Sequence, residues 1–173
     1  VSGAAACGLP VVATMSFDTN GRTMMGITPE DAAIFASSLK PGLAAYGCNC
    51  GVGPATLINT VLGLKSSAGP DDVITAKGNC GIPEYVDGAI AYTGSPEIMF
   101  EYARMARDAG ARIIGGCCGT TDIHVKAMHD ALQGYEPEAA PDRARIEEKL
   151  GPIDQALPRA DTADARSRRR RRS

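Results

Sequence analysis

The sequence predicts an α/β fold built on a parallel β-sheet. Four segments rich in strand-forming residues each lead through a glycine-containing turn or loop into a helical pattern, and such alternation is typical of parallel sheets. The first of these strand segments is almost continuously apolar, as expected for a strand buried on both faces. With 173 residues, of which 44% are hydrophobic and 22% charged, the chain is long enough for one domain with a substantial core.

The first two strand–helix units are predicted between residues 11 and 64. The strand 11–17 precedes a helix that Thr28 caps. The expected apolar face of that helix comprises Ala32, Phe35, Ala36 and Leu39. The second unit joins the strand 43–46 to a helix over 55–64 through a turn rich in glycine and cysteine.

The third and fourth units follow the same order. The strand 72–77 leads into a turn and then a long loop up to Gly94, after which Ser95 caps the most regular helix of the chain. The apolar face of that helix is expected to be Ile98, Tyr102, Met105, Ala106 and Ala109. The strand 111–114 precedes the last helix of the series, capped by Thr120 or Thr121. Its expected apolar face is Ile123, Ala127, Ala131 and Leu132.

The last quarter of the chain has a different composition. We therefore divide the sequence into a folded unit, 1–135, and an extension, 136–173, in which proline, alanine and charged residues dominate. A short helix is expected over 143–150, outside the main core, and disorder beyond about residue 152. The arginine-rich segment 166–173 carries no interleaved aromatic side chain for base stacking, so we interpret it as a solvated tail and expect no nucleic-acid partner.

The composition also limits the cellular setting. Six cysteines could form a disulfide framework, but most of them lie in turns that follow strands, which favours free thiols in a reducing compartment such as the cytoplasm. No apolar run is long enough to span a membrane, and the opening segment 1–6 lacks the basic start of a signal peptide. The absence of an initiator Met suggests a fragment of a longer chain.

Cys117 and Cys118 are the most informative residues, because they sit side by side among glycines after the fourth strand. Adjacent Cα atoms are about 3.8 Å apart, closer than the roughly 4.4–6.8 Å that a disulfide requires. Two thiolates could instead bind one metal ion, and the alternative is a pair of buried structural thiols. Two architectures fit the four units: an open doubly wound sheet, or half of a (β/α)8 barrel.

In a barrel the turns after all strands would share one rim. Cys50, Cys80, Cys117 and Cys118 follow strands, so they could converge there. Three thiolates around zinc would leave the fourth tetrahedral position open, as in catalytic zinc sites. An iron–sulfur cluster is the alternative, although none of its usual cysteine spacings occurs.

Two turns resemble those of the homocysteine S-methyltransferase family. The first is Gly47-Cys48-Asn49-Cys50 followed by Gly53-Pro54, and the second is Gly115-Gly116-Cys117-Cys118-Gly119-Thr120-Thr121. The resemblance runs from about Pro10 to Leu132. It implies a (β/α)8 TIM barrel, of which this chain forms the last four βα units, and one Zn²⁺ held by Cys50, Cys117 and Cys118.

The remaining cysteines and both histidines receive no metal role. Cys48 occupies a variable position of the first motif and Cys80 a turn that the family does not use for ligands, so we interpret both as small buried residues. Cys7, before the first strand, has no functional interpretation. His124 is expected to make structural hydrogen bonds near the last turn, and His129 to lie on a helix surface.

The resemblance further implies zinc-dependent transfer of a methyl group to the thiol of homocysteine, which gives methionine. The donor could be betaine, S-methylmethionine or a methylated corrinoid protein. The chain begins at the family's fifth strand, so either it is part of a longer polypeptide or it pairs with another half-barrel as an oligomer. Alone, we expect weak zinc binding and no useful turnover. The alternatives are a non-catalytic zinc or thiol α/β module and an inactive fragment.

Overall fold

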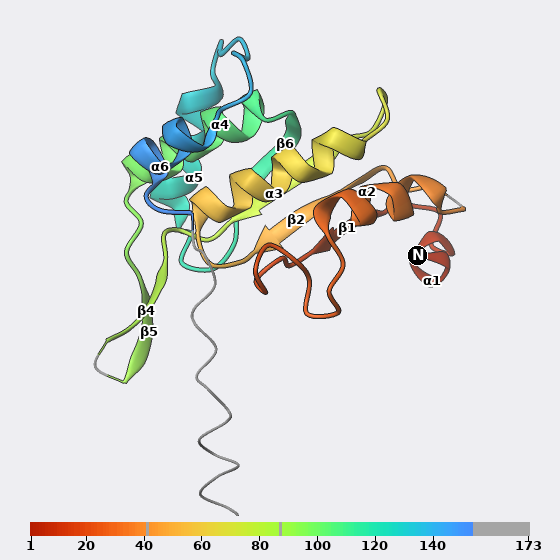
Figure 1. The fold of residues 1–173 in the computed structure, drawn as a ribbon, viewed down its shortest axis with the longest axis horizontal. Coiled ribbons are helices and arrows are strands. Elements are labelled where there is room, and N and C mark those ends of the chain that lie inside the picture. Colours follow the sequence, from red (N-terminus) through yellow and green to blue (C-terminus); the bar gives the residue numbers. More distant parts are fainter. Residues whose placement is uncertain (41, 87, 154–173) are drawn as a thin grey trace, which may run out of the picture.

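The protein was analysed as a computed structural model, which describes residues 1–40, 42–86 and 88–153 (Figure 1). The expected disordered tail and its arginine-rich segment lie outside these residues. Within them, no helix combines the length and the apolar character that crossing a bilayer requires.

Four parallel strands form the main sheet, and all four correspond to predicted strands. They are β1 (Val12–Met15), β2 (Ala45–Cys50), β3 (Ile74–Gly78) and β6 (Ala111–Gly116). Their order in the sheet is β1-β2-β3-β6, which is also their order along the chain. A doubly wound sheet reverses its strand order near the middle. The described sheet has no such reversal, so the doubly wound alternative is not supported.

The helices that follow these strands pack on one face of the sheet (Figure 1). They are α2 (Pro29–Ser38), α3 (Pro54–Ser67), α4 (Pro96–Asp108) and α5 (Asp122–Leu132). The predicted caps of α2 and α4 are confirmed, because the Thr28 and Ser95 hydroxyls accept hydrogen bonds from backbone N–H groups three residues later. Thr121 caps α5.

Two short elements were not predicted. The long loop expected after β3 contains an antiparallel hairpin of β4 (Pro83–Val86) and β5 (Ala89–Tyr92), and α1 (Ser2–Ala5) is a single helical turn. The Asp87-Gly88 dipeptide is a common hairpin turn sequence, but the flanking strands are too short to show a clear alternation. Figure 1 shows the hairpin projecting away from the helices.

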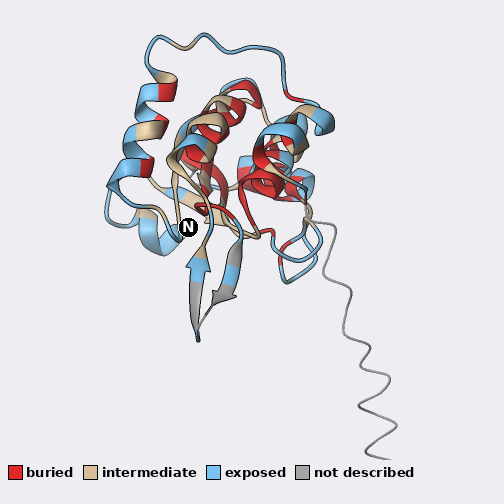
Figure 2. Ribbon diagram, turned by 90° about the vertical axis from the view of Figure 1, so that its left-hand side faces the viewer, coloured by how far each residue is buried: buried red, intermediate tan, exposed pale blue. Residues whose placement is uncertain are grey.

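The core lies between the sheet and its helices (Figure 2). Tyr102 of α4 is its largest fully buried side chain. The Tyr102 hydroxyl accepts a hydrogen bond from the Gly78 N–H at 3.0 Å and donates one to the Gly115 carbonyl at 3.4 Å. This hydroxyl therefore joins β3 to β6 close to the point where both strands end, which fixes the spacing of the turns that follow.

Two predicted helix faces need correction. Phe35 of α2 is 54% exposed, whereas Ala33 is fully buried. The helix α2 packs mainly against α3, so the side that carries Ala33 is covered while the Phe35 side stays partly open. In α5, Ile123 is 56% exposed and His124 and Met128 are buried instead, since the helix faces α4 with a side rotated by about one residue.

The helix α6 (Arg143–Leu150) was correctly predicted, but its expected position outside the core is wrong. Ile146 is fully buried, and α6 packs against α3 and α4. The reason is a buried carboxylate at the end of α4. Asp108 accepts hydrogen bonds from the Tyr135 hydroxyl and the Glu138 N–H, and it pairs with Arg145 at 3.3 Å. These contacts fasten the extension to the folded unit.

Candidate metal centre

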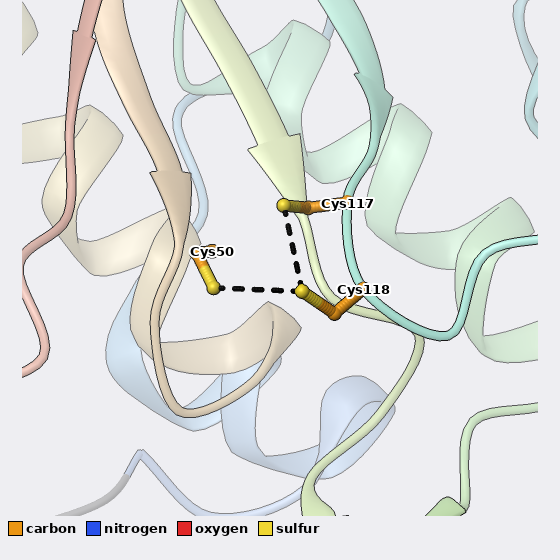
Figure 3. A group of neighbouring side chains, drawn as sticks. All are labelled: Cys50, Cys117 and Cys118. Carbon is orange, nitrogen blue, oxygen red and sulfur yellow. Dashed lines mark hydrogen bonds between the residues drawn. The ribbon is translucent and has the colours of Figure 1, made fainter.

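Three cysteine side chains converge at the carboxyl ends of the strands. Cys50 is the last residue of β2, and Cys117 and Cys118 follow β6 directly. Because β3 lies between β2 and β6, the two turns reach toward each other across the end of β3 (Figure 3). The Sγ atoms of Cys50 and Cys118 are 3.8 Å apart, and those of Cys117 and Cys118 are 3.9 Å apart.

The sulfur positions fit a zinc ion. A tetrahedral ion with Zn–S bonds of about 2.3 Å places its sulfur ligands about 3.8 Å from one another. All three sulfurs lie within 4.8 Å of one another, and the described residues contain no other group of three or more His, Cys, Asp or Glu side chains of this kind. Three soft thiolates without a carboxylate or imidazole favour zinc over hard cations. A fourth tetrahedral position would remain free for another ligand.

Cys50 adopts an unusual backbone conformation. Its φ is +62°, in the left-handed region that residues other than glycine rarely occupy. Such a conformation costs about 1–3 kcal/mol and persists where surrounding contacts enforce it, often at functional sites. The chain reverses here between β2 and α3, so the strained residue is the one that presents its sulfur to Cys118.

Asn79 organises the site, and the sequence analysis missed it. Its side chain is almost fully buried at the end of β3. Its Oδ1 accepts a hydrogen bond from the Cys118 N–H at 3.1 Å, and its Nδ2 donates one to the Gly51 carbonyl at 2.7 Å. One amide group thus joins the two cysteine turns. The available signal was its position: Asn79 follows a strand directly, in the same layer of turns as Cys50.

The surroundings shift two of the three thiols in opposite directions. The pKa of Cys50 is raised, chiefly by burial. The pKa of Cys118 is lowered, chiefly by a hydrogen bond from the Tyr92 hydroxyl and then by hydrogen bonds to Cys50 and Cys117. Without a metal, these opposite shifts favour ionisation of Cys118 over that of Cys50.

The other three cysteines stay outside the cluster, and all six are free thiols. Cys48 is fully buried in the core, where burial raises the pKa of its thiol to about 12. Cys80 is buried and donates a hydrogen bond from its thiol to the Gly94 carbonyl at 3.1 Å. Cys7 is exposed. The interpretation of Cys48 and Cys80 as small buried residues is confirmed.

Both histidines lie where the sequence predicted. His124 is buried in the first turn of α5, and its Nδ1 accepts a hydrogen bond from the Thr121 N–H at 3.1 Å. It completes a capping box with Thr121, which is a structural role. His129 lies on the surface of α5, with 66% of its side chain exposed.

Comparisons with known proteins identify relatives of this sequence. A profile of the family described as homocysteine S-methyltransferase matches residues 1–132. Betaine–homocysteine S-methyltransferase 1 of Danio rerio is 31% identical over 153 residues, which cover 78% of this chain and 38% of that protein. S-methylmethionine–homocysteine S-methyltransferase BHMT2 of Pongo abelii is 31% identical over 149 residues, which cover 76% of this chain and 40% of that protein.

The chain thus spans about two fifths of the length of these curated relatives. The profile match includes the resemblance expected from the two cysteine turns and extends it to the first residue. This chain therefore belongs to the homocysteine S-methyltransferase family.

Proposed function

We propose that this chain carries the zinc centre of an enzyme that transfers a methyl group to the thiol of homocysteine, giving methionine. Cys50, Cys117 and Cys118 are the proposed ligands. The observation that carries the proposal is the spacing of their sulfurs: two pairs at 3.8 and 3.9 Å match the edge of a zinc tetrahedron, and the third pair lies within 4.8 Å. Family membership then supports homocysteine as the thiol that takes the fourth corner.

The chemistry requires a reactive thiolate. Bound zinc would favour loss of the homocysteine thiol proton to solvent, so that the sulfur enters as a thiolate. The three protein thiolates outweigh the charge of one Zn²⁺, so the incoming sulfur stays electron-rich. A bond would then form between this sulfur and the methyl carbon, while the bond from that carbon to the donor atom would break and its electron pair would leave with the donor. No protein side chain needs to act as a general base.

The site residues also restrict how the two reactants meet. Asn79 holds the two cysteine turns together from one side. Cys118 is exposed, so the thiol and the donor can approach the site from solvent. In an in-line attack, the homocysteine sulfur would approach the methyl carbon from the side opposite the bond that breaks.

The printed names of the two relatives specify betaine and S-methylmethionine as donors for those proteins. For this chain we propose a donor whose methyl group is activated in the same way. Betaine, S-methylmethionine and a methylated corrinoid protein remain alternatives.

We further propose that the four βα units form part of a (β/α)8 barrel, closed by more units of the same polypeptide or by a second copy. A reducing compartment such as the cytoplasm would keep the three thiols free.

Zinc content and sulfur coordination test this proposal. The chain should bind one zinc, and X-ray absorption should show a fourth sulfur ligand when homocysteine is added. Cys118→Ala should lose the metal, whereas Cys7→Ala, which removes an exposed thiol outside the cluster, should retain it. No zinc in the chain would contradict the ligand assignment. Zinc without a homocysteine-dependent sulfur would instead support the non-catalytic module.

A further inference from the structure

The ring of Tyr92 lies directly against the turn that carries the cysteine pair. Tyr92 is the last residue of β5, and Gly119 follows Cys118. A Cβ atom added to Gly119 would lie only 2.4 Å from Cγ and 2.8 Å from Cδ2 of the Tyr92 ring. Gly119 also has a φ of +75°. Both facts indicate that the turn is shaped to accept this ring.

The base of the hairpin is fastened to the same turn through Cys80. The Cys80 N–H donates a hydrogen bond to the Cys118 carbonyl at 2.9 Å. The Cys80 carbonyl accepts one from the Gly94 N–H at 3.2 Å, and the Cys80 thiol donates one to the Gly94 carbonyl at 3.1 Å. One residue thus connects the cysteine turn to the chain two residues beyond Tyr92.

We propose that Tyr92 is a positioning residue of the metal centre, held against Gly119 by the β4–β5 hairpin, with its hydroxyl directed at the Cys118 sulfur. A hydroxyl directed in this way would lower the pKa of the Cys118 thiol, which is the direction of its shift. Cys118 is then held at two points: its N–H donates a hydrogen bond to Asn79, and its sulfur would accept one from the Tyr92 hydroxyl. The hairpin forms a wall of the site rather than a free loop.

This role has a consequence for the chemistry of the metal. A hydrogen bond to a coordinating thiolate removes electron density from the sulfur and fixes the direction of its lone pairs. Loss of such supporting contacts typically lowers metal affinity about 10–100-fold. Because Cys118 is exposed and Tyr92 only half-buried, we expect a change of about tenfold, the lower end of that range.

The position of the ring can be tested without any metal. In the metal-free chain, the Tyr92 ring should shift the α-proton resonances of Gly119 by its ring current. Tyr92→Phe should keep this shift, and Tyr92→Leu should abolish it while leaving resonances of the remote helix α6 unchanged. A Gly119 resonance at its ordinary position in the wild-type chain would overturn the proposal, whatever the metal content.

The hydroxyl can be tested with cobalt, which absorbs where zinc does not. The proposal rests on the proposed function, and the ring-current measurement above distinguishes the failure of one from the failure of the other. In the Co²⁺-substituted chain, Tyr92→Phe should move the sulfur-to-cobalt charge-transfer band to lower energy, and the Zn²⁺ affinity should fall about tenfold.

Tyr135→Phe is a matched control, since it removes a hydroxyl bonded to Asp108 at the far end of α4. A cobalt band and zinc affinity unchanged in Tyr92→Phe would reduce Tyr92 to a packing residue and overturn the proposal. A wild-type chain that shows the ring-current shift but takes up no cobalt would contradict the proposed function and leave the placement of Tyr92 intact.

Discussion

Asn79 is the residue on which the two cysteine turns depend. Its amide satisfies the Cys118 N–H and the Gly51 carbonyl, at 3.1 and 2.7 Å. Both groups belong to turns that must hold sulfurs at fixed spacing. Truncation of the Asn79 side chain would therefore leave the Cys118 N–H and the Gly51 carbonyl unpaired. These two groups lie on different sides of the candidate metal site.

We expect Asn79→Ala to lower zinc affinity about 10–100-fold and the free energy of unfolding by about 1–3 kcal/mol. Asn49→Ala is a matched control, because the Asn49 amide makes only a 3.5 Å contact with the Ser16 hydroxyl, just after β1. Competition with a chromophoric zinc chelator would measure the affinity, and urea denaturation the stability. Equal zinc affinity in Asn79→Ala and wild type would show that the turns keep their positions without the bridge.

The ligand residues could be predicted from the sequence, but their supporting contacts could not. Cys50, Cys117 and Cys118 follow strand segments, and parallel strands end at one edge of their sheet, so local patterns were enough to bring them together. Asn79 and Tyr92 reach the site through contacts between turns that lie far apart in sequence. The geometry of those contacts depends on how β3 and the hairpin are placed, which no local pattern specifies.

At the scale of elements, α6 shows how one charged residue can redirect a segment. The composition of the extension suggested a solvated helix, because charged residues dominate it. The deciding feature lies elsewhere, at the end of α4, where the side chain of Asp108 is completely buried and paired with Arg145. A charge buried at the end of an otherwise apolar helix face requires a partner, and the extension supplies it.

We expect Ile146→Ala to lower the free energy of unfolding by about 2–5 kcal/mol, the usual cost of truncating a buried large aliphatic side chain. Ile146 is fully buried between α6 and its neighbours. Glu148→Ala, on the exposed side of the same helix, should change stability by less than about 0.5 kcal/mol. Urea denaturation of both variants tests this. A loss as small for Ile146 as for Glu148 would mean that α6 does not contribute to the core.

The hydrogen bonds that Asp72 makes to neighbouring elements predict that the stability of the fold depends on pH. The Asp72 carboxylate, just before β3, accepts hydrogen bonds from the Gly69 N–H, the Ser37 hydroxyl of α2 and the Tyr46 hydroxyl of β2, at 2.8–3.0 Å. Burial alone would raise the pKa of Asp72, but these bonds and nearby Lys65 outweigh it and lower the pKa. A carboxyl whose pKa is lower in the folded state stabilises the fold above its unfolded pKa of about 3.9. That stabilisation is lost as the pH falls through the folded pKa.

Asp72→Asn should therefore destabilise the chain at pH 7, and its difference from wild type should shrink below about pH 4. Asp71→Asn changes an exposed neighbour of the same charge and should show little effect at either pH. Urea denaturation between pH 7 and pH 3 measures both variants. A difference between Asp72→Asn and wild type that stays constant over this range would show that the charge of Asp72 is not what stabilises the contact.

At the scale of the whole molecule, the sheet has two open edges. Among the described residues, β1 pairs only with β2 and β6 pairs only with β3. The order of strands was predictable, because consecutive βα units place each new strand beside the last. What lies beyond each edge could not be derived from the pattern of this chain, because that pattern orders only the strands within it.

The open edges also expose apolar side chains. Val12 on β1 is 50% exposed and Ile113 on β6 is 42% exposed. The registers place both side chains on one face of the sheet, because Thr14, Gly47, Thr75 and Ile113 are paired in series and Val12 is two residues from Thr14. Unpaired strands with apolar residues are sites of association between chains.

We expect the chain to self-associate through these edges in a concentration-dependent way. Sedimentation velocity should show species heavier than a monomer. The double variant Val12→Lys and Ile113→Lys should associate at least about tenfold more weakly, since an unpaired charge at the contact costs more than about 1.4 kcal/mol. Ile123→Lys is the matched control, because Ile123 is 56% exposed on α5 and lies on no strand. A monomer at every concentration, or equal weakening by Ile123→Lys, would contradict association through the strand edges. Self-association that the edge substitutions abolish would support closure of the sheet by further strands, as the proposed barrel requires.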